Sequence, residues 1–415
     1  MKIHIIGGGV IGLCSAWFLH QAGFEVVVID QNTFSEGTSY GNAGLIVPSH
    51  FVPLASPGAI RKAIHWILNR NSPFSIRPRF NPELVRWLWQ FYRSCTPENV
   101  NRASLLLKDF HELSKTLYRQ FSEMDPFQFN FEMKGLLMVY QTAEAEKEEQ
   151  ETAVKANKLG IETLVLDSSE IRDFDKATLI TARGAVFYPG DAHLNPGLFM
   201  HQFVKLLKSA GVRFISNVAV RSFEKNTRQI ERLILSNGTR IQTEEVVIAA
   251  GSWSGQLASQ LGIRLLLQAG KGYSITYVNP KIRPSVPSIL SEAKVAITPM
   301  GDHLRVGGTL EIGNLTGNIN KNRLKGILQS IPRYYPGLGL SSPNLKEVWQ
   351  GYRPCTPDGL PYIGRASDYT NLTIATGHAM MGMSLGPATG LIVSEIICGK
   401  PLSLDLSLFA PGRFW

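Results

Sequence analysis

Cysteine is scarce in this sequence: 415 residues contain only four, Cys14, Cys95, Cys355 and Cys398. No two of them form a C-x-x-C pair, so neither a zinc site nor a redox-active dithiol is indicated, and we expect no metal centre. So few cysteines suit a reducing compartment.

Long apolar runs are also missing. No stretch approaches about 18 continuous apolar residues, so we expect no helix that spans a membrane. Met1 and Lys2 lead directly into an apolar strand pattern, so we expect no secretory leader. Together these features predict a cytoplasmic protein.

Acidic residues are fewer than basic ones, 33 against 42, which gives a formal net charge of +9. Such an excess suits an anionic substrate or an anionic surface, or serves solubility alone. No array of interleaved aromatic and basic residues resembles a nucleic-acid module, so we expect no nucleic-acid partner.

The first thirty residues carry the strongest local pattern. An apolar strand, residues 2–6, is followed by the G-x-G-x-x-G turn at 7–12, a helix, and a second strand that ends at Asp30. Glycines at such positions permit the tight turn, close approach to a pyrophosphate, and close packing of helix on strand. The acid then lies where it can accept a hydrogen bond from a ribose hydroxyl. We therefore predict dinucleotide binding; the alternative is a glycine turn of no chemical consequence, against which Asp30 argues.

Periodicity predicts the remaining elements. Small polar residues at 31–46 suit a loop around a ligand, and an ordinary surface loop is the alternative. Helical patterns cover 58–124, 143–159 and 195–210, and strands cover 134–141, 212–215, 246–250, 272–277, 295–299 and 303–309, with a hairpin at 230–241.

Six motifs spread along the chain resemble one family. They are GGGVIG with Asp30, TSYGNAG at 38–44, VVIAAGSWS at 246–254, KGYS at 271–274, GYRPCTPDGLPYIG at 351–364 and TGHAMMGMSLGPATG at 376–390. With them the chain resembles the D-amino-acid oxidase/glycine oxidase superfamily of FAD-dependent oxidoreductases, and within it the D-amino-acid dehydrogenase branch. The resemblance runs nearly from end to end.

The resemblance implies a fold of class α/β, with α+β character in the second domain. A Rossmann-like FAD-binding domain would comprise residues 1–50, 185–222, 240–257 and 340–415. A discontinuous substrate domain, built on an antiparallel sheet plus helices, would comprise residues 51–184, 223–239 and 258–339.

The resemblance also implies which residues bind FAD. One group holds the pyrophosphate and the adenosine, a second backs the isoalloxazine, and a third opens a helix whose amides stabilise negative charge on the reduced flavin. These residues are Gly7, Gly9, Val10, Ile11, Gly12, Asp30, Gln31, Asn32, Thr38, Ser39, Val218, Asn42, Ala43, Gly44, Leu45, Ala249, Ala250, Gly251, Trp253, Gly377, His378, Gly382, Met383, Ser384 and Leu385. Tyr352, and not Cys355, stands where relatives attach flavin covalently, which implies non-covalent FAD.

The substrate site implied by the resemblance centres on Arg353, whose guanidinium would bind the substrate carboxylate in a bidentate pair. The alternative is a structural arginine paired to an acid such as Asp358. Tyr273 and Tyr352 are weaker candidates for the pocket wall, with a core or surface role the alternative. Met380 and Met381 stand where glycine oxidases often have a polar residue, which suggests a larger or less polar substrate, such as a proline or hydroxyproline ring.

The implied reaction is oxidative deamination of a D-amino or cyclic imino acid, by hydride transfer from Cα to flavin N5, with electrons passed to a quinone or another carrier. Catalysis would be mostly positioning. The histidines, His20, His50, His193 and His378 among them, sit in no evident dyad, and His378 would touch the flavin or serve the loop. A glycine- or sarcosine-type oxidase that uses oxygen is one alternative, and a non-catalytic flavin-binding protein is another.

A basic, aromatic stretch remains at 61–93. It carries seven basic residues against the single acid Glu83, with Trp66, Trp87 and Trp89 interleaved. Such a stretch can lie on the anionic inner face of a membrane as a peripheral contact. The alternative is a helical excursion whose apolar side is core.

Overall fold

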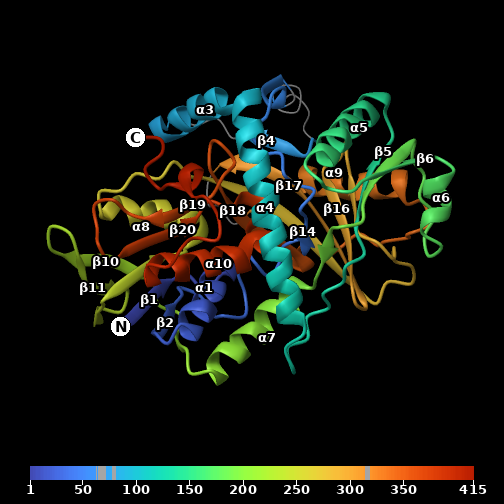
Figure 1. The fold of residues 1–415 in the computed structure, drawn as a ribbon. Helices are drawn as coiled ribbons and strands as arrows, with labels where there is room; N and C mark the ends of the chain where they lie inside the picture. The colour runs from blue at the N-terminus through green and yellow to red at the C-terminus, as the bar shows by residue number, and fades with distance from the viewer. Residues whose placement is uncertain (62, 64–71, 77–80, 314–317) are drawn as a thin grey trace.

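The computed structural model describes residues 1–415 except 62, 64–71, 77–80 and 314–317. The fold is built on two large sheets, and the long helix α4 (Pro97–Ser122) runs down the middle of Figure 1 in front of them. The first has six strands in the order β19-β20-β13-β1-β2-β9, all parallel except the pair β19–β20. They are β1 (Lys2–Ile6), β2 (Glu25–Ile29), β9 (Arg213–Ile215), β13 (Glu245–Ile248), β19 (Tyr362–Arg365) and β20 (Leu372–Thr376).

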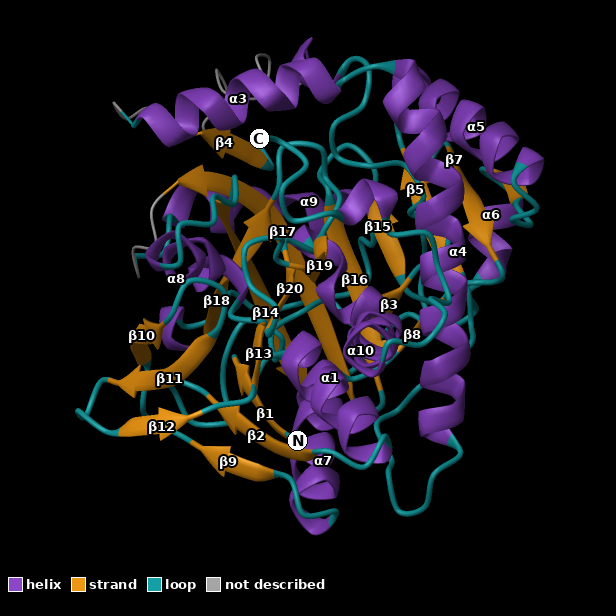
Figure 2. Cartoon of the chain, turned by 60° about the vertical axis from the view of Figure 1, so that its left-hand side comes forward, coloured by secondary structure: helices purple, strands orange, loops and turns teal. Residues whose placement is uncertain are grey.

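The central strands of this sheet are apolar on both faces because both faces are covered. In β2, Val26 and Val28 face one core while Val27 and Ile29 face another. The first core contains helices α1 (Val10–Gln21) and α7 (Pro196–Ser209). The second contains α8 (Ser254–Gln260) and a small sheet of β10 (Val220–Lys225), β11 (Ile230–Leu235) and β12 (Arg240–Gln242), seen beside β9 in Figure 2.

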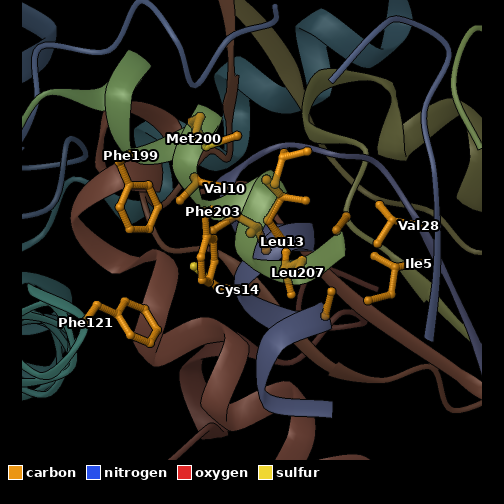
Figure 3. Close-up of a cluster of buried hydrophobic side chains, with 14 of the residues drawn as sticks. Ile5, Val10, Leu13, Cys14, Val28, Phe121, Phe199, Met200, Phe203 and Leu207 are labelled. Carbon is orange, nitrogen blue, oxygen red and sulfur yellow. The ribbon is translucent and has the colours of Figure 1, made fainter. Parts of the chain in front are cut away.

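Aromatic rings fill the first core. Phe199 and Phe203 of α7 pack against Phe121 of α4, with ring centroids 5.1 to 6.4 Å apart, and Leu13 of α1 lies beside them (Figure 3). Aromatic contacts at these separations stabilise a core beyond the area that they bury. These contacts join α1, α4 and α7 in one core.

Helix α10 (Gly382–Cys398) crosses α1 at close range. A Cβ at Gly390 would lie 2.4 Å from the backbone carbon of Cys14, so only glycine allows this approach. With the turn before it, α10 is long and apolar enough to cross a membrane by composition, but most of that span is buried inside the protein. Its apolar character is therefore explained by its place between α1 and α4.

The second sheet has nine strands, mostly antiparallel, in the order β18-β14-β17-β16-β15-β5-β7-β6, with β4 paired to β17. They are β4 (Phe74–Ile76), β5 (Leu136–Tyr140), β6 (Leu164–Asp167), β7 (Gly184–Tyr188), β14 (Gln268–Val278), β15 (Ser288–Leu290), β16 (Val295–Met300), β17 (His303–Gly313) and β18 (Val348–Cys355). Helix α9 (Lys321–Tyr334) packs on it. The other described elements are β3 (Leu45–Ile46), β8 (Ala192–His193), α3 (Pro82–Ser94), α5 (Ala143–Lys158), α6 (Glu170–Phe174) and the 3₁₀ turns Gly251–Trp253, Leu345–Glu347, Ala379–Met381 and Ser407–Phe409.

The predicted fold class is confirmed, and the structure corrects several boundaries. The prediction that residues 223–239 belong to the substrate domain is wrong, because β11 packs on the six-stranded sheet. Conversely, β7 and β18 fall in the predicted FAD-binding domain, although both pair within the nine-stranded sheet. The helical pattern at 58–124 is interrupted by β4, and part of it lies outside the described residues.

Candidate active site

A cavity of about 1210 Å³ lies between the two sheets. One wall comes from the loops that follow β1, β2 and β13, which is where parallel sheets bind ligands. The opposite wall comes from β14, β17 and β18, and the turn before α10 adds a third side. A ligand that fills the cavity therefore touches both sheets.

The glycine turn has the geometry that its sequence predicts. Gly7 has φ +115°, and a Cβ there would lie 2.4 Å from the carbonyl oxygen of Ala249. A Cβ at Gly12 would lie 1.9 Å from the carbonyl oxygen of Gly7, so this glycine lets α1 pack on β1. Gly9 is open towards the cavity, since a Cβ there would meet Ser39 Oγ at 3.4 Å, an ordinary contact distance. An extended phosphate group fits against this turn and the N-terminus of α1.

Asp30 holds the turn as well as lining the cavity. Its Oδ2 accepts a hydrogen bond from Gly8 N at 2.7 Å, and its Oδ1 accepts one from Asn32 N at 2.9 Å. Burial raises the pKa of Asp30, while the two backbone hydrogen bonds oppose that rise. The carboxylate thus fixes the turn and remains beside the cavity, where a ribose hydroxyl would meet it.

Most of the residues predicted to bind cofactor or substrate line this one cavity. They are Gly7, Gly9, Val10, Ile11, Asp30, Gln31, Asn32, Thr38, Ser39, Asn42, Ala43, Leu45, Val218, Ala249, Ala250, Gly251, Trp253, Tyr273, Tyr352, Arg353, His378, Gly382 and Met383. Segments far apart in the sequence therefore meet at one place. The residue types fit FAD: an open glycine turn, a carboxylate and two helix N-termini surround a space large enough for a dinucleotide.

Five of the predicted cofactor residues lie behind the wall instead. Gly12 serves the packing described above, and Gly44 adopts φ +75° against the carbonyl of Leu194. Gly377 adopts φ +85° in the turn before α10. Ser384 Oγ accepts a hydrogen bond from Val47 N at 3.0 Å, and Leu385 packs in the core with Phe110. These residues shape the site without facing it.

The N-terminus of α10 reaches the cavity at Gly382. No side chain from the described part of the chain caps it, so its amides remain able to bind negative charge placed beside them. His378 stands just before it, with Nε2 3.0 Å from Thr389 Oγ1. Burial lowers the pKa of His378 to about 3, so this imidazole is neutral and serves the loop.

Arg353 extends from β18 over the backbone of Gly272: a Cβ at Gly272 would lie 2.0 Å from its Nη1. Nη1 donates to the carbonyl oxygen of Thr309 at 2.5 Å. Among the described residues no carboxylate forms an ion pair with Arg353, because Asp358 is bound at 2.7 and 2.9 Å by Arg413. The alternative of an Arg353–Asp358 pair is therefore wrong, and the guanidinium is a charge that an anionic ligand can neutralise.

Thr309 itself is unusual. It adopts φ +70°, which a β-branched residue rarely tolerates, at an irregularity in the pairing of β14 with β17. That conformation turns its carbonyl to Arg353. Backbone strain of this kind is stored at functional sites when the surrounding structure enforces it.

The two tyrosines differ. Tyr352 faces Trp253 edge-on, with ring centroids 6.1 Å apart, at the cavity wall. Tyr273 lies largely in the core beneath the sheet, where its hydroxyl donates to Glu311 and accepts from Asn320 N at 3.0 Å. The hydroxyl of Tyr273 is thus engaged away from Arg353.

Two further cavity residues, Trp349 and Thr309, were not predicted from the sequence. The indole of Trp349 lies over two glycines: a Cβ would come within 1.9 Å of it at Gly41 and 2.0 Å at Gly351. Glycines inside three of the quoted motifs, at 41, 272 and 351, mark the places where a side chain covers the backbone. A glycine in a motif thus indicates that a side chain packs on the backbone there, but it does not identify that side chain.

The fold and the cavity together define a dinucleotide-dependent enzyme whose second sheet places a cation, Arg353, at the cavity wall. The chain belongs to the DAO family of FAD-dependent oxidoreductases, whose model matches residues 2–396. The predicted family and the enzyme class are thus confirmed.

Proteins named D-amino acid dehydrogenase are similar over the full length. The one from Rhizorhabdus wittichii is 33% identical over 431 residues, covering 100% of both chains. The one from Helicobacter pylori is 29% identical over 398 residues, covering 95% of this chain and 94% of the relative. Among solved structures, glycine oxidase from Geobacillus kaustophilus has a TM-score of 0.79 at 20% identity, covering 99% of each chain, and shows the fold alone.

Proposed function

We propose that this protein is an FAD-dependent dehydrogenase that oxidises a D-amino or cyclic imino acid and passes the electrons to a quinone or another carrier. The observation that carries the proposal is the Arg353 guanidinium at the cavity, held by a carbonyl and by no described carboxylate. Full-length similarity to proteins named D-amino acid dehydrogenase supports it.

Arg353 binds the carboxylate of the substrate in this account. One N–H is committed to the Thr309 carbonyl, and the remaining donors form a fork that matches two carboxylate oxygens. Burial lowers the pKa of Arg353, which means that the surroundings leave its charge uncompensated until an anion arrives. The pair fixes the orientation of Cα as well as its position.

Bound FAD supplies the two-electron acceptor. The amides at the start of α10 stabilise negative charge that develops beside them. Apolar side chains of Leu54, Phe74 and Leu310 line the same cavity. They support an apolar or cyclic substrate side chain.

We propose that the flavin is held without a covalent bond to cysteine. None of the four cysteines, all in the described part of the chain, lines the cavity. Cys355, the nearest in sequence to Arg353, is fully buried, and burial raises its pKa to about 12. A thiol so placed has little thiolate character for attachment.

Anaerobic mixing of the yellow holoenzyme with a panel of substrates tests the function. The panel contains D-alanine, D-proline, hydroxy-D-proline, glycine and sarcosine. We expect a D-amino or D-imino acid to bleach the flavin, and little peroxide on readmission of air. Rapid peroxide release would favour the oxidase alternative, and no bleaching by any compound would favour a non-catalytic flavin protein.

We further propose a cytoplasmic enzyme that touches the inner face of the membrane through α3. Trp87 does not contribute, because it is buried and its Nε1 donates to the Cys355 carbonyl at 2.9 Å. Trp89 and Tyr92 are 58% and 60% exposed, on the helix that carries Arg86 and Arg93. Lys62, Trp66, Arg70, Arg77 and Arg79 lie outside the described residues. Helix α3 lies on the outside of the molecule in Figure 2.

A further inference from the structure

A chain of three polar side chains leads away from the cavity. His50 lines the cavity, its Nδ1 lies 3.1 Å from Ser49 Oγ, and Ser49 Oγ lies 2.5 Å from Asp191 Oδ2. Residues 142 positions apart meet here because β3 pairs with β8, with Ile46 opposite Ala192. No partner for His50 is evident in the sequence; the fold supplies one.

The directions of these hydrogen bonds can be assigned. Asp191 accepts from Ser49 N at 3.1 Å and from the Ser49 hydroxyl. Since that hydroxyl proton points to Asp191, Ser49 Oγ accepts from His50 Nδ1–H, which leaves the lone pair on His50 Nε2. No hydrogen bond from a described residue engages Nε2. Serine stands between histidine and aspartate, so the order differs from that of a nucleophilic triad.

The surroundings of Asp191, which ends the row of side chains far from the cavity, favour its protonated form. Burial raises the pKa of Asp191 to about 7; the two hydrogen bonds from Ser49 and the charge of Lys115 oppose that rise, and Glu112 adds to it, the last two residues coming from α4. The phenol of Tyr188 on β7 also lies close enough to interact with this carboxylate. Lys115 Nζ donates to the carbonyl oxygen of Gly190 at 3.0 Å, and the side chains of Lys115 and Glu112 are 15% and 41% exposed, so the buried Asp191 lies on the side of the row that is near the surface at α4.

The surroundings of His50, at the cavity, favour its neutral form instead. Burial lowers the pKa of His50 to about 4, helped by Lys294 from the turn between β15 and β16. His111 of α4 also lies close enough to interact with His50. A proton that enters at His50 is therefore more stable on Asp191.

We propose that His50, Ser49 and Asp191 form a proton exit that deprotonates the substrate ammonium group. The inference rests on the proposed function, because amine oxidation needs the neutral amine. One N–H bond of the ammonium breaks and His50 Nε2 takes the proton; the Nδ1 proton moves to Ser49 Oγ and the hydroxyl proton to Asp191 Oδ2. The amine keeps the electron pair, no electron is transferred, and Asp191 releases its proton to solvent. After product release, His50 Nε2 gives its proton to the water that replaces the product, while Nδ1 regains a proton from solvent through Asp191 and Ser49, so the starting tautomer returns.

The test is the pH dependence of anaerobic flavin reduction in the holoenzyme. In the parent protein the rate should rise with pH through about 7, as Asp191 ionises. Asp191→Asn and Ser49→Ala should each lose about 10- to 100-fold near neutral pH, and the loss should vanish at high pH, where the substrate amine is already neutral. Ser49→Thr, which keeps the hydroxyl, should recover most of the rate.

Ser330→Ala is the matched control, a buried serine on α9 whose hydroxyl bonds only within its own helix among the described residues. It should keep the parent profile. If Asp191→Asn or Ser49→Ala reduces flavin with the parent pH profile, or with a deficit equal at all pH values, the relay is refuted. A parent protein that no amine reduces would instead refute the proposed function, so the two failures are distinct.

Discussion

Replacement of Arg353 by alanine should leave FAD bound and turnover severely reduced. Most of the predicted cofactor residues lie in the loops that follow β1, β2 and β13 and at the start of α10, whereas Arg353 belongs to β18 on the opposite wall. Loss of a charge-assisted bidentate pair costs about 2–4 kcal/mol in transition-state binding, or roughly 30- to 1000-fold in kcat/KM.

Arg353→Lys should also be poor. One N–H of the arginine is held by the Thr309 carbonyl, and no other described residue forms a hydrogen bond with the rest of the fork. A lysine ammonium is a point charge, so it cannot keep that anchor and also present two parallel donors to a carboxylate. We expect Arg353→Lys to lie closer to the alanine variant than to the parent.

The assay is anaerobic flavin reduction at a range of substrate concentrations, with the visible flavin spectrum reporting bound FAD. Arg86→Ala is a suitable control, since this arginine of α3 packs on Trp415 away from the cavity. A kcat/KM near the parent value in Arg353→Ala would refute the assignment. Loss of FAD together with activity would also contradict it.

Three further expectations follow from the same geometry. Acid precipitation should release the flavin into the supernatant, and yellow colour retained in the washed pellet would contradict non-covalent binding. Gly272→Ala should barely change the melting temperature, because the added methyl group displaces only the end of the flexible Arg353 side chain. It should nevertheless lower kcat/KM about 10- to 100-fold, because the guanidinium moves from its position. An unchanged kcat/KM would show that the guanidinium is not needed there. In liposome sedimentation the protein should bind anionic vesicles in a salt-sensitive way and lose binding in Trp89→Ser/Tyr92→Ser, whereas weak binding to neutral and anionic vesicles alike would remove the membrane proposal.

The sequence predicted correctly those elements whose boundaries depend on nearby residues. The unit from β1 to Asp30 and the capped helix α7 match their predicted ranges closely, because glycine turns, caps and apolar periodicity act over a few residues. The sheet membership of β7 and β18 was mispredicted, because pairing partners far along the chain decide it. Residues 223–239 were assigned to the other domain for the same reason.

In the candidate site, too, the sequence predicted the residues that belong to local motifs and missed those that distant pairing brings together. The glycine turn, Asp30 and Arg353 stand in recognisable motifs, and the structure brings them to one cavity. Tyr273 belongs to such a motif too, but the face of a strand that a residue occupies depends on register, and its hydroxyl meets Glu311 instead. Thr309 and Asp191 carry no motif, since their roles come from a backbone conformation and from the pairing of β3 with β8.

The most direct test of the central claim is anaerobic titration of the holoenzyme with D-amino and D-imino acids, followed at the flavin absorbance band. The account predicts stoichiometric bleaching by at least one D-compound, none by its L-enantiomer, and loss of that bleaching at the same concentrations in Arg353→Ala. A flavin that stays oxidised with every compound, or that Arg353→Ala reduces as readily as the parent, would contradict it.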